Sequence, residues 1–507
     1  MDRGSLKIKS KVFGYINKLV AVAICVNALL LGNVQAKDLF AKKTPKKTKV
    51  VVIGAGLSGL ATGYYLKKQG IPYHLLEITP RAGGRVRTVT YRYPYKEQVY
   101  ADSGMEEYWE SNPAVKVLRE LKLPLRVDYA VSSLNIGGKI EKLNGEDTEG
   151  YMHRILNKDE YQALEDFKKK VAPIISELHT DKNIRPELLK LKDTSFADWM
   201  ATQGLPKKVS EWVRISVECE AGTEWNRISA IDGLAEFHIF LGKGEKSYRV
   251  IGGNEIFIDR FANAVGYKNI SVNKRVIRVQ TLKDRVRVFY SDLSDNDSGY
   301  VDADYVVSTI PLFRLFEVQF EPALSQKKRQ AITSQNWGSY FKVHTFVPSS
   351  ISHYWKNNGE SYLPLLADNE LGVVYEGNPD QNGKLKVISL LIFGSEAEAL
   401  NMMPLDQVRD RVKTAFDKMW PGFSKHIMDM EFFRFHPRAI GAWPVGRSRF
   451  DELSQEIRTP ENGVYLAGDF TESSHSDGAF LSAARVTRQI KADIQERKSS
   501  QRKLAHD

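Results

Sequence analysis

The chain of 507 residues is too long for one ordinary hydrophobic core, and its 42% hydrophobic and 27% charged residues are typical of a globular protein. Most of the net charge of +11 lies near the N-terminus, since residues 1–36 hold five Lys or Arg and one Asp, and residues 37–50 hold six Lys and one Asp. Residues 51–507 are left with about +2, too little to support a nucleic-acid-binding surface. We therefore expect two or more domains, a globular architecture and no nucleic-acid partner.

The first 36 residues have the composition of a secretory signal peptide. Basic residues precede the apolar run LVAVAICVNALLL at 19–31, and Val34 and Ala36 occupy the small-residue positions that a signal peptidase recognises. The apolar run has 13 residues, fewer than the ~20 that a membrane-spanning helix needs. We expect a cleaved signal peptide at 1–36, an exported protein that is periplasmic or secreted, and no stable transmembrane anchor. An uncleaved N-terminal anchor is the alternative.

The chain contains two cysteines, Cys25 and Cys219, and Cys25 lies in the predicted signal peptide. A mature chain with Cys219 alone forms no internal disulfide and no cysteine-based metal cluster. We expect no metal site.

Strand and helix patterns that belong together are spread over three separated parts of the chain. The run KVVVIGAG at 49–56 predicts a buried strand, the segment to about Gln69 predicts a helix, and YHLLEI at 73–78 predicts a second strand. Similar strand ends occur in DYVVSTIP at 304–311 and in GVYLAGDF at 463–470, which precedes a further helix pattern. We expect an α/β fold, in which a Rossmann-like nucleotide-binding domain is assembled from discontinuous segments and an α+β substrate domain is inserted.

The stretches between these patterns differ in character. Helical periodicity dominates 150–245, whereas 340–430 mixes strands with a helix near 404–420. The expected divisions are a Lys-rich linker at 37–48, nucleotide-binding segments at 49–125, 246–320 and 431–495, a helical substrate-domain segment at 126–245, a mixed-sheet substrate-domain segment at 321–430, and a flexible tail at 496–507.

A glycine motif lies between the first predicted strand and its helix. Gly54 permits a tight turn, Gly56 lets the backbone approach a pyrophosphate, and Gly59 lets helix and strand pack closely. Leu57 and Ser58 open the helix, whose N-terminal N–H groups and dipole favour phosphates, and Ser58 is placed to contribute its amide or hydroxyl. The motif alone is weak evidence, but its position between strand and helix predicts a dinucleotide site.

Glu77 ends the second predicted strand, 18 residues after Gly59. An acid at this place accepts hydrogen bonds from an adenosine ribose in dinucleotide-binding folds. The alternative is a surface acid at a strand terminus. The motif favours the ribose contact.

An Arg-x-Gly-Gly-Arg sequence follows Glu77 directly, and a nicotinamide site has no use for it. Here the sequence resembles the flavin-dependent amine oxidase superfamily, which comprises monoamine and polyamine oxidases, L-amino acid oxidases and desaturase-like relatives. The family's second FAD signature is matched by Glu77, Arg81, Gly83, Gly84, Arg85 and Thr88. The resemblance implies bound FAD. The glycines let the backbone turn near the diphosphate, while an arginine offers a fork to a phosphate or braces the loop.

Further matches extend the resemblance over most of residues 47–492. ADSGMEEYW at 101–109 is similar to a family segment whose backbone, here at Gly104 and Met105, runs beside the flavin ring, and Val276 takes the place of an adenine contact. IGGNEIFIDRFA at 251–262 matches a Gly-Gly helix opening. The resemblance also implies a C-terminal flavin clamp in LAGDFTESSHSDGAFLSAAR that contains Gly468, Asp469, Gly478 and Ala479. A turn or helix cap is the alternative role of Asp469.

Lys342 lies in the strand-like run GSYFKVHTF. Family members hold a lysine here that is hydrogen-bonded through water to the reactive ring nitrogen of the flavin, so the resemblance implies a catalytic role. A lysine on an apolar strand is costly to bury unless it is paired or functional. A lysine that reaches solvent from an edge strand is the alternative.

Two departures from the family pattern concern the active site. The stretch FHPRAIGAWPVG at 435–446 has no cysteine for covalent attachment, so FAD is expected to bind non-covalently. Ala439 replaces one wall of the aromatic cage that holds the amine in monoamine oxidases. The cage is then absent or is rebuilt from Trp355, Trp443 or Tyr354, and His475 and Ser476 lie near the other wall. Ordinary core packing of these aromatic residues is the alternative.

The resemblance implies an FAD-dependent amine oxidase. Hydride passes from a carbon next to nitrogen to the flavin, the imine hydrolyses, and dioxygen reoxidises the flavin to give hydrogen peroxide. The expected partners are a small-molecule amine and dioxygen, and no particular amine or oligomeric state is predicted. The alternatives are an FAD-dependent desaturase or protoporphyrinogen-type oxidase, and a flavin-binding protein without turnover.

Overall fold

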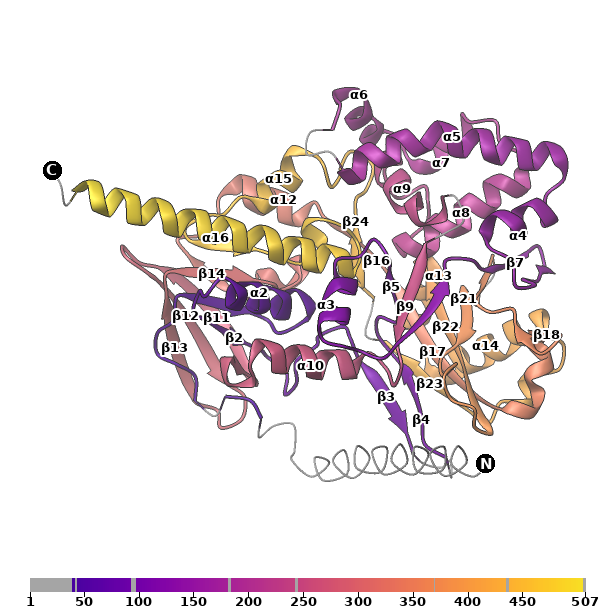
Figure 1. Ribbon diagram of the computed structural model, residues 1–507, viewed down its shortest axis with the longest axis horizontal. Coiled ribbons are helices and arrows are strands. Elements are labelled where there is room, and N and C mark those ends of the chain that lie inside the picture. Colours follow the sequence, from indigo (N-terminus) through magenta and orange to yellow (C-terminus); the bar gives the residue numbers. More distant parts are fainter. Residues whose placement is uncertain are drawn as a thin grey trace, which may run out of the picture.

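The computed structural model describes residues 39–41, 43–92, 97–180, 184–241, 245–368, 370–434 and 437–504. The predicted signal peptide, 1–36, lies outside these residues. Two halves lie side by side (Figure 1). One is built around β1, β2 and β14 with helices α2, α10 and α16, and in the other a layer of helices lies above a sheet that contains β17 and β22. The predicted mixed α/β class is confirmed.

A five-stranded sheet forms the centre of the first half. All its pairings are parallel, and β1 pairs with β2 on one side and β14 on the other. The strands are continuous apolar runs because both faces of the sheet are covered. They come from three separated parts of the chain. In spatial order they are β10 (Ile270–Ser271), β2 (Tyr73–Leu76), β1 (Val50–Ile53), β14 (Tyr305–Ser308) and β25 (Val464–Leu466).

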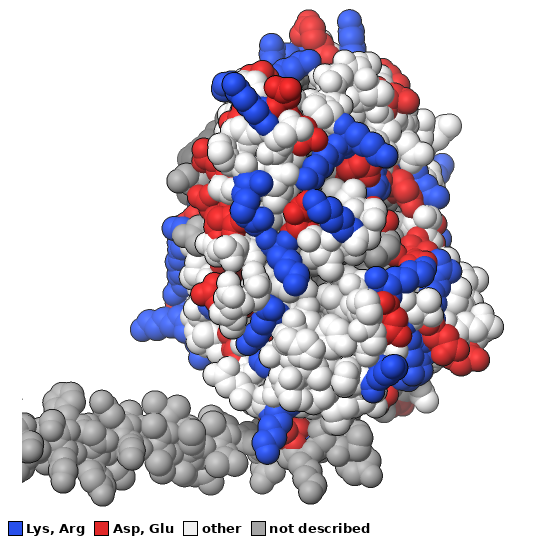
Figure 2. All heavy atoms as spheres, turned by 90° about the vertical axis from the view of Figure 1, so that its right-hand side faces the viewer, with Lys and Arg blue, Asp and Glu red and all other residues white. Residues whose placement is uncertain are grey.

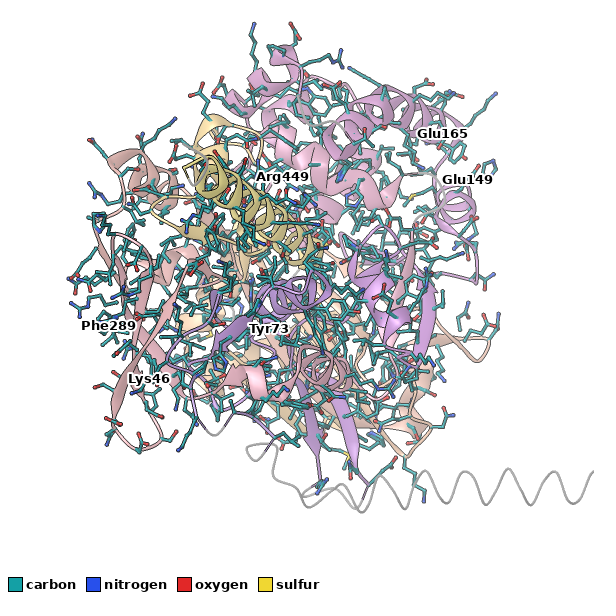
Figure 3. The ribbon with its side chains drawn as sticks, turned by 60° about the vertical axis from the view of Figure 1, so that its left-hand side comes forward. Lys46, Tyr73, Glu149, Glu165, Phe289 and Arg449 are labelled. Carbon is teal, nitrogen blue, oxygen red and sulfur yellow. The ribbon has the colours of Figure 1, made fainter. Side chains whose placement is uncertain are left out.

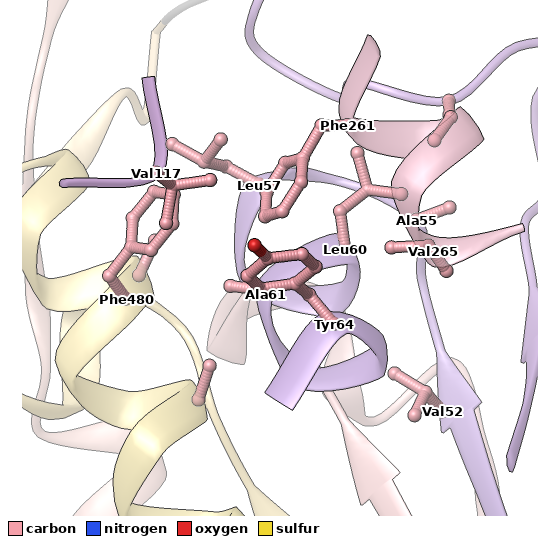
Figure 4. Packing of buried hydrophobic residues seen from close by; sticks show 14 of the residues in the cluster. Val52, Ala55, Leu57, Leu60, Ala61, Tyr64, Val117, Phe261, Val265 and Phe480 are labelled. Atoms are coloured by element: carbon pink, nitrogen blue, oxygen red, sulfur yellow. The ribbon is translucent and has the colours of Figure 1, made fainter. Parts of the chain in front are cut away.

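Helices from distant parts of the sequence cover one face of this sheet. Leu60 and Tyr64 of α2 pack with Phe261 of α10 and Phe480 of α16 in one hydrophobic cluster (Figure 4). Because neighbours surround α2 on several sides, nine of its 12 residues are buried, which explains why it lacks a clear polar face. The helices of this layer are α2 (Leu57–Lys68), α3 (Ala114–Glu120), α10 (Glu255–Val265) and α16 (Ser476–Leu504).

A second sheet packs on the opposite face. Val51 and Ile53 of β1 share a cluster with Val279 and Val288 of this sheet. Its strands are, in spatial order, β13 (Ser298–Ala303), β12 (Val286–Asp292), β11 (Lys274–Thr281) and β15 (Gln319–Glu321). The parallel sheet is therefore held between helices and a smaller sheet.

The other half contains a seven-stranded sheet with helices on its two sides. Phe341 and Leu390 of this sheet pack with Phe416 of α14, and a separate cluster around Phe196, Trp212 and Phe237 forms the core of the helical layer. The strands are, in order, β23 (Asp429–Phe433), β17 (Tyr340–Pro348), β22 (Leu385–Phe393), β21 (Val373–Glu376), β20 (Leu365–Ala367), β7 (Ser133–Ile136) and β8 (Lys139–Glu141). The main helices are α4 (Thr148–Ile155), α5 (Lys158–Thr180), α7 (Phe196–Ala201), α8 (Lys207–Ala221), α9 (Ala230–Glu236), α13 (Gly394–Met402) and α14 (Leu405–Met419).

Small sheets connect the two halves. They are β5–β9–β6, with bounds Tyr108–Trp109, Lys246–Val250 and Leu125–Tyr129, the hairpin β3 (Thr88–Tyr91) and β4 (Val99–Asp102), and the pair β16 (Asn336–Gly338) and β24 (Ile440–Ala442). Residue 104 follows β4, and residue 439 precedes β24. Both candidate flavin segments are thus placed at the junction of the two halves.

Four predicted boundaries divide features of the structure. The division at 125/126 falls inside β6. The division at 320/321 falls inside β15 and separates Leu315 from Ile332 of α12 (Gln326–Thr333), which belong to one hydrophobic cluster with Ile457 of α15 (Glu452–Arg458). The division at 430/431 falls inside β23. The flexible tail expected from 496 is helical as far as Leu504, because QERKSSQRKL continues α16 with good helix formers.

The face formed by the second half carries charges of both signs. Figure 2 shows Lys and Arg interspersed with Asp and Glu over this side of the molecule. Within the described ranges, no helix has the length and apolar character that crossing a membrane requires.

Candidate active site

The first glycine turn links β1 to α2 and leaves space at one position. A Cβ on Gly59 would lie 2.0 Å from the carbonyl oxygen of Gly54, whose φ is +99°, so the protein's own packing requires both glycines. A Cβ on Gly56 would meet only the Cα of Gly84, at 3.8 Å. No side chain caps α2 at Gly56, and the first N–H groups of a helix lack intrahelical partners. The turn therefore offers an open cradle for an anion.

A second glycine turn lies against the first. Gly83 forms an isolated bridge with Gly56. Arg81 donates through Nη1 to the carbonyl oxygen of Val86 at 3.1 Å and through Nη2 to that of Gly84 at 2.8 Å. An arginine here is expected either to contact a phosphate or to brace the loop. The hydrogen bonds of Arg81 brace the loop.

Glu77 is buried at the end of β2, with 6% of its surface exposed. Its carboxylate accepts hydrogen bonds from the backbone N–H of Ala55 at 2.7 Å and from the N–H and hydroxyl of Thr79 at 2.9 and 2.8 Å. The alternative of a surface acid is thus wrong for this position. The fixed carboxylate and the buried Val276 both line the cavity described below.

Arg85 and Asp469 join the first glycine-rich segment to the C-terminal segment. Nη1 and Nη2 of Arg85 donate to the two carboxylate oxygens of Asp469 at 2.8 and 2.6 Å, and Nη1 also donates to the carbonyl oxygen of Ala439. Burial alone would lower the pKa of Arg85, but the charge of Asp469 outweighs it and raises that pKa. This charged fork locks together segments almost 400 residues apart in the sequence.

Lys342 lies on β17 with 1% of its surface exposed. Its Nζ donates to the carbonyl oxygen of Gly104 at 2.8 Å and forms an ion pair with Glu106. Glu106 also accepts a hydrogen bond from the Tyr375 hydroxyl and lies 3.6 Å from Arg249. Lys342 is therefore buried and paired, and the alternative of a lysine that reaches solvent is wrong.

Two residues further along β17, on the same face, His344 supports the same backbone segment. Its Nε2 is 3.1 Å from the carbonyl oxygen of Asp102, and its Nδ1 is 2.7 Å from the Tyr91 hydroxyl. Burial, with the charge of Lys342, lowers the pKa of His344 to about 3, so the ring is neutral. Together Lys342 and His344 hold both ends of the Asp102–Gly104 segment.

A second charge network joins the helical layer to the C-terminal segment. His475 Nε2 lies 3.1 Å from Glu220 of α8, and Nδ1 lies 3.5 Å from Glu236 of α9. Arg449 pairs with Glu236 and, through Nε at 2.7 Å, with Asp232. Arg449, labelled in Figure 3, is buried, with 5% of its surface exposed. The network fixes α8 and α9 beside the start of α16.

This network predicts a pH dependence of stability. Burial alone would lower the pKa of His475, but the hydrogen bond with Glu220 and the charge of Glu236 raise it from 6.5 to about 9. The folded chain then keeps a proton that the unfolded chain loses, so the stabilisation is complete below pH 6.5 and is lost as the pH rises through about 9. We expect the free energy of unfolding of His475→Gln to fall less across this window than that of the wild type in urea titrations. Equal slopes for the two proteins would contradict the assignment.

One cavity of about 880 Å³ connects these features. Of the residues predicted from the sequence, those that line it are Gly54, Gly56, Leu57, Ser58, Glu77, Gly83, Gly84, Arg85, Gly104, Met105, Val276, Lys342, Gly468, Asp469, His475 and Ala479. Gly59, Arg81 and Gly478 do not line the cavity. Gly478 has no room for a Cβ, because the carbonyl oxygen of Asp469 would lie 2.8 Å from it. The cavity thus runs from the two glycine turns past Gly104 to Lys342 and Tyr375. Its residues fit an elongated, phosphate-bearing group.

The structure does not bring Trp355 and Trp443 to this cavity. Trp355 is fully buried beside the seven-stranded sheet, where its indole N–H donates to Glu376 at 2.9 Å. Trp443 lies under the Arg449 guanidinium, 4.6 Å from ring centroid to charge. Both side chains serve core packing, the alternative that the sequence left open. Of the five residues suggested for this region, His475 and Ser476 line the cavity, and Trp355, Trp443 and Tyr354 do not.

Sequence reasoning missed residues that line the substrate side, among them Tyr340, Tyr375, Glu106, Glu107, Glu220 and Arg249. The sequence could have predicted Tyr340, because Tyr340 precedes Lys342 by two positions and residues two apart on a strand lie on the same face. Tyr375 and Arg249 come from other elements, β21 and β9, and only tertiary structure places them here. Across the described part of the chain, no group of three or more His, Cys, Asp or Glu is arranged to hold a metal ion.

A glycine-rich turn at the carboxyl end of the central strand of a parallel sheet, a fixed acid on the next strand and a cavity that leads to a buried lysine together define a dinucleotide-dependent oxidoreductase. The model of the family "flavin containing amine oxidoreductase" matches residues 57–491. The chain therefore belongs to the flavin-containing amine oxidoreductase family, and it is an FAD-dependent amine oxidase.

Individual proteins of known activity are similar to this chain in sequence or in fold. The chain is 24% identical over 484 residues to an L-amino acid oxidase of Cerastes cerastes, with 89% of this chain and 88% of that protein covered. The structure of putrescine oxidase bound to putrescine superposes with a TM-score of 0.75 at 19% identity, covering 88% of this chain and 99% of the other. Cyclohexylamine oxidase from Brevibacterium oxydans IH-35A gives a TM-score of 0.72 at 18% identity, covering 89% and 100%. The two structures establish similarity of fold.

Proposed function

We propose that this chain binds FAD non-covalently along the cavity and oxidises an amine at the place where Lys342 and Tyr375 line it. The observation that carries the proposal is the continuity of the cavity from the Gly56 cradle to the buried ammonium of Lys342. The half built on the parallel sheet is then a Rossmann-like FAD-binding domain of discontinuous segments, and the half built on the seven-stranded sheet is the substrate domain.

Each part of the cofactor site has a proposed task. The N-terminus of α2 at Gly56 and the second turn at Gly84 would hold the diphosphate, and Glu77 would accept hydrogen bonds from the ribose. The Arg85–Asp469 fork would hold the C-terminal segment against the remainder of the cofactor. The cavity-lining Cys219 is a poor candidate for covalent attachment, since burial raises the pKa of its thiol.

Bound FAD supplies the electron chemistry, accepting a hydride from the carbon next to the amine nitrogen and passing two electrons to dioxygen, which leaves an imine and hydrogen peroxide. The chain's own residues prepare the site. Lys342 and Glu106 place a fixed ion pair at the cavity wall, and the Gly104 carbonyl is held by the Lys342 ammonium. Tyr340 and Tyr375 form aromatic walls that exclude water from the reacting carbon. A substrate nitrogen that arrives neutral requires no side-chain base.

The test is anaerobic mixing of the purified holoprotein with amines, polyamines and amino acids while the flavin absorbance is followed. We expect at least one amine to bleach the flavin and to yield peroxide when air is admitted. Bleaching by none of them, with FAD shown to be bound, would contradict the proposal and favour a desaturase or a flavin-binding protein without turnover.

We also propose that the chain is exported, with cleavage after Ala36. The support is the basic leader, the short apolar run and the small residues at positions 34 and 36. N-terminal sequencing of the protein recovered from the cells that produce it is expected to begin at Lys37. Recovery with residues 1–36 intact would contradict cleavage.

A further inference from the structure

The cations that line the substrate side of the cavity are all paired with carboxylates. Four cations face this region or support its wall: Lys342, Arg249, His475 and Arg449. Their carboxylate partners are Glu106, Glu107, Glu220 and Glu236, which line the cavity, and Asp232, which lies behind its wall. Every one of the four cations already has a carboxylate partner. None of these four cations is therefore left unpaired to receive an anionic group of a substrate.

Two of the lining carboxylates have fewer compensating partners than the other two. Glu106 is compensated by Lys342, the Tyr375 hydroxyl and Arg249, and Glu236 is compensated by Arg449, His475 and the Ser474 hydroxyl. By contrast, the one ion pair of Glu107 among the described residues is with Arg249, at 3.5 Å, and that of Glu220 is with His475, at 3.1 Å.

Both of the less compensated carboxylates line the cavity. The side chain of Glu107 is 31% exposed and that of Glu220 is 18% exposed. Burial raises the pKa of Glu107, Arg249 offsets this in part, and the charges of Glu106 and Glu220 raise it further. A cation bound between the two carboxylates would remove this unfavourable interaction, because opposite charges at short range stabilise one another in a water-poor site.

The same arrangement disfavours a substrate with a carboxylate. An amino acid needs an uncommitted cation for its carboxylate, and the four cations of this region are all engaged. Freeing Arg249 for that purpose would leave Glu107 without its ion pair, and removing one partner of a buried charge pair is costly.

We infer that the preferred substrate is a diamine or polyamine, whose second cationic nitrogen is bound by Glu107 and Glu220 while its other nitrogen is oxidised. The inference rests on the proposed oxidase function. Tyr340, Tyr375, Leu366 and Val373 line the same cavity and provide apolar contact for the methylene chain between the two nitrogens.

Four substrates separate the contribution of a second amine in the substrate from that of a carboxylate. Pentylamine, 1,5-diaminopentane, L-norleucine and L-lysine differ only in the presence of a second amine and of a carboxylate. We expect kcat/KM for 1,5-diaminopentane to exceed that for pentylamine by about tenfold or more, and the carboxylate to lower kcat/KM in both series. The comparison is repeated with monoamines and diamines of four to eight carbons, so that a different spacing of the two nitrogens is detected.

Two variants assign the preference to the carboxylates. Glu107→Gln and Glu220→Gln are each expected to reduce the ratio of diamine to monoamine kcat/KM by about tenfold. Glu110→Gln is the matched control, because Glu110 lies three residues beyond Glu107, is exposed and does not line the cavity. It is expected to keep the wild-type ratio.

A binding measurement keeps the inference testable if a variant folds poorly. Calorimetric titration of the wild-type holoprotein compares pentane-1,5-bis(trimethylammonium) with pentyltrimethylammonium, whose nitrogens have no lone pair to support hydride loss. The dication is expected to bind about tenfold more tightly. If no amine bleaches the flavin, the proposed function itself fails. If amines are oxidised but the monoamine or the amino acid is preferred, or if the dication gains no affinity, the function stands and this inference is overturned.

Discussion

Replacement of Lys342 by Met is expected to lower kcat for amine oxidation by about a hundredfold or more while FAD stays bound. Methionine retains the volume of the side chain but removes the ammonium that donates to the Gly104 carbonyl and neutralises Glu106. Glu106 would keep only the Tyr375 hydroxyl and the more distant Arg249, at 3.6 Å. The measurement is single-turnover flavin bleaching under anaerobic conditions, together with the FAD content from the absorbance of the purified protein.

Lys386 provides a matched control on the neighbouring strand β22. It is also buried, with 8% of its surface exposed, and it is held by the carbonyl oxygen of Gln381 at 2.7 Å and by Glu376 at 3.9 Å. It does not line the cavity. Lys386→Met is expected to lower the free energy of unfolding by about 1–3 kcal/mol and to leave kcat within about a factor of three. Equal losses of kcat in the two variants would show that Lys342 acts through stability alone.

The nucleotide side of the cavity could be predicted because its chemistry is encoded locally. Gly54, Gly56 and Gly59 occur at fixed spacing between one strand and one helix, and Glu77 ends the next strand. Each requirement is a backbone shape or a strand end, and both follow from short-range sequence patterns. The same holds for Lys342, which is conspicuous as a cation on an apolar strand.

The substrate side could not be predicted in this way, because it is assembled by long-range pairing. Glu106, Arg249 and Tyr375 come from three separate segments, and their ion pairs depend on which strands become neighbours. Trp355 illustrates the converse error. Its size and chemistry suit an aromatic cage, but whether a tryptophan faces a cavity or a core depends on packing that no local pattern shows.

Replacement of Gly56 by Ala is expected to abolish or greatly weaken FAD binding without destabilising the protein's own fold. The φ of Gly56 is −69° and its ψ is −173°, an extended conformation that alanine adopts readily, and the nearest protein atom to an added Cβ would be 3.8 Å away. The new methyl group would therefore occupy only the space in which we propose that the diphosphate lies. We expect the affinity for FAD to fall by about a hundredfold, which corresponds to ~2.7 kcal/mol. The measurements are the FAD content of the purified variant and a calorimetric titration with FAD.

Gly59→Ala in the same turn separates lost ligand space from a disrupted fold. Its Cβ would lie 2.0 Å from the Gly54 carbonyl oxygen, so α2 must move away from β1, and the protein without FAD is expected to lose stability. For Gly56→Ala, the unfolding temperature without FAD should match that of the FAD-depleted wild type, while the increase that added FAD produces in the wild type should disappear, since only a bound ligand stabilises the folded state. A Gly56→Ala protein that retains its yellow colour and the full thermal response to FAD would place the diphosphate elsewhere. A loss of stability as large as that of Gly59→Ala would instead show that Gly56 serves packing, and the open cradle would no longer be evidence for a phosphate site.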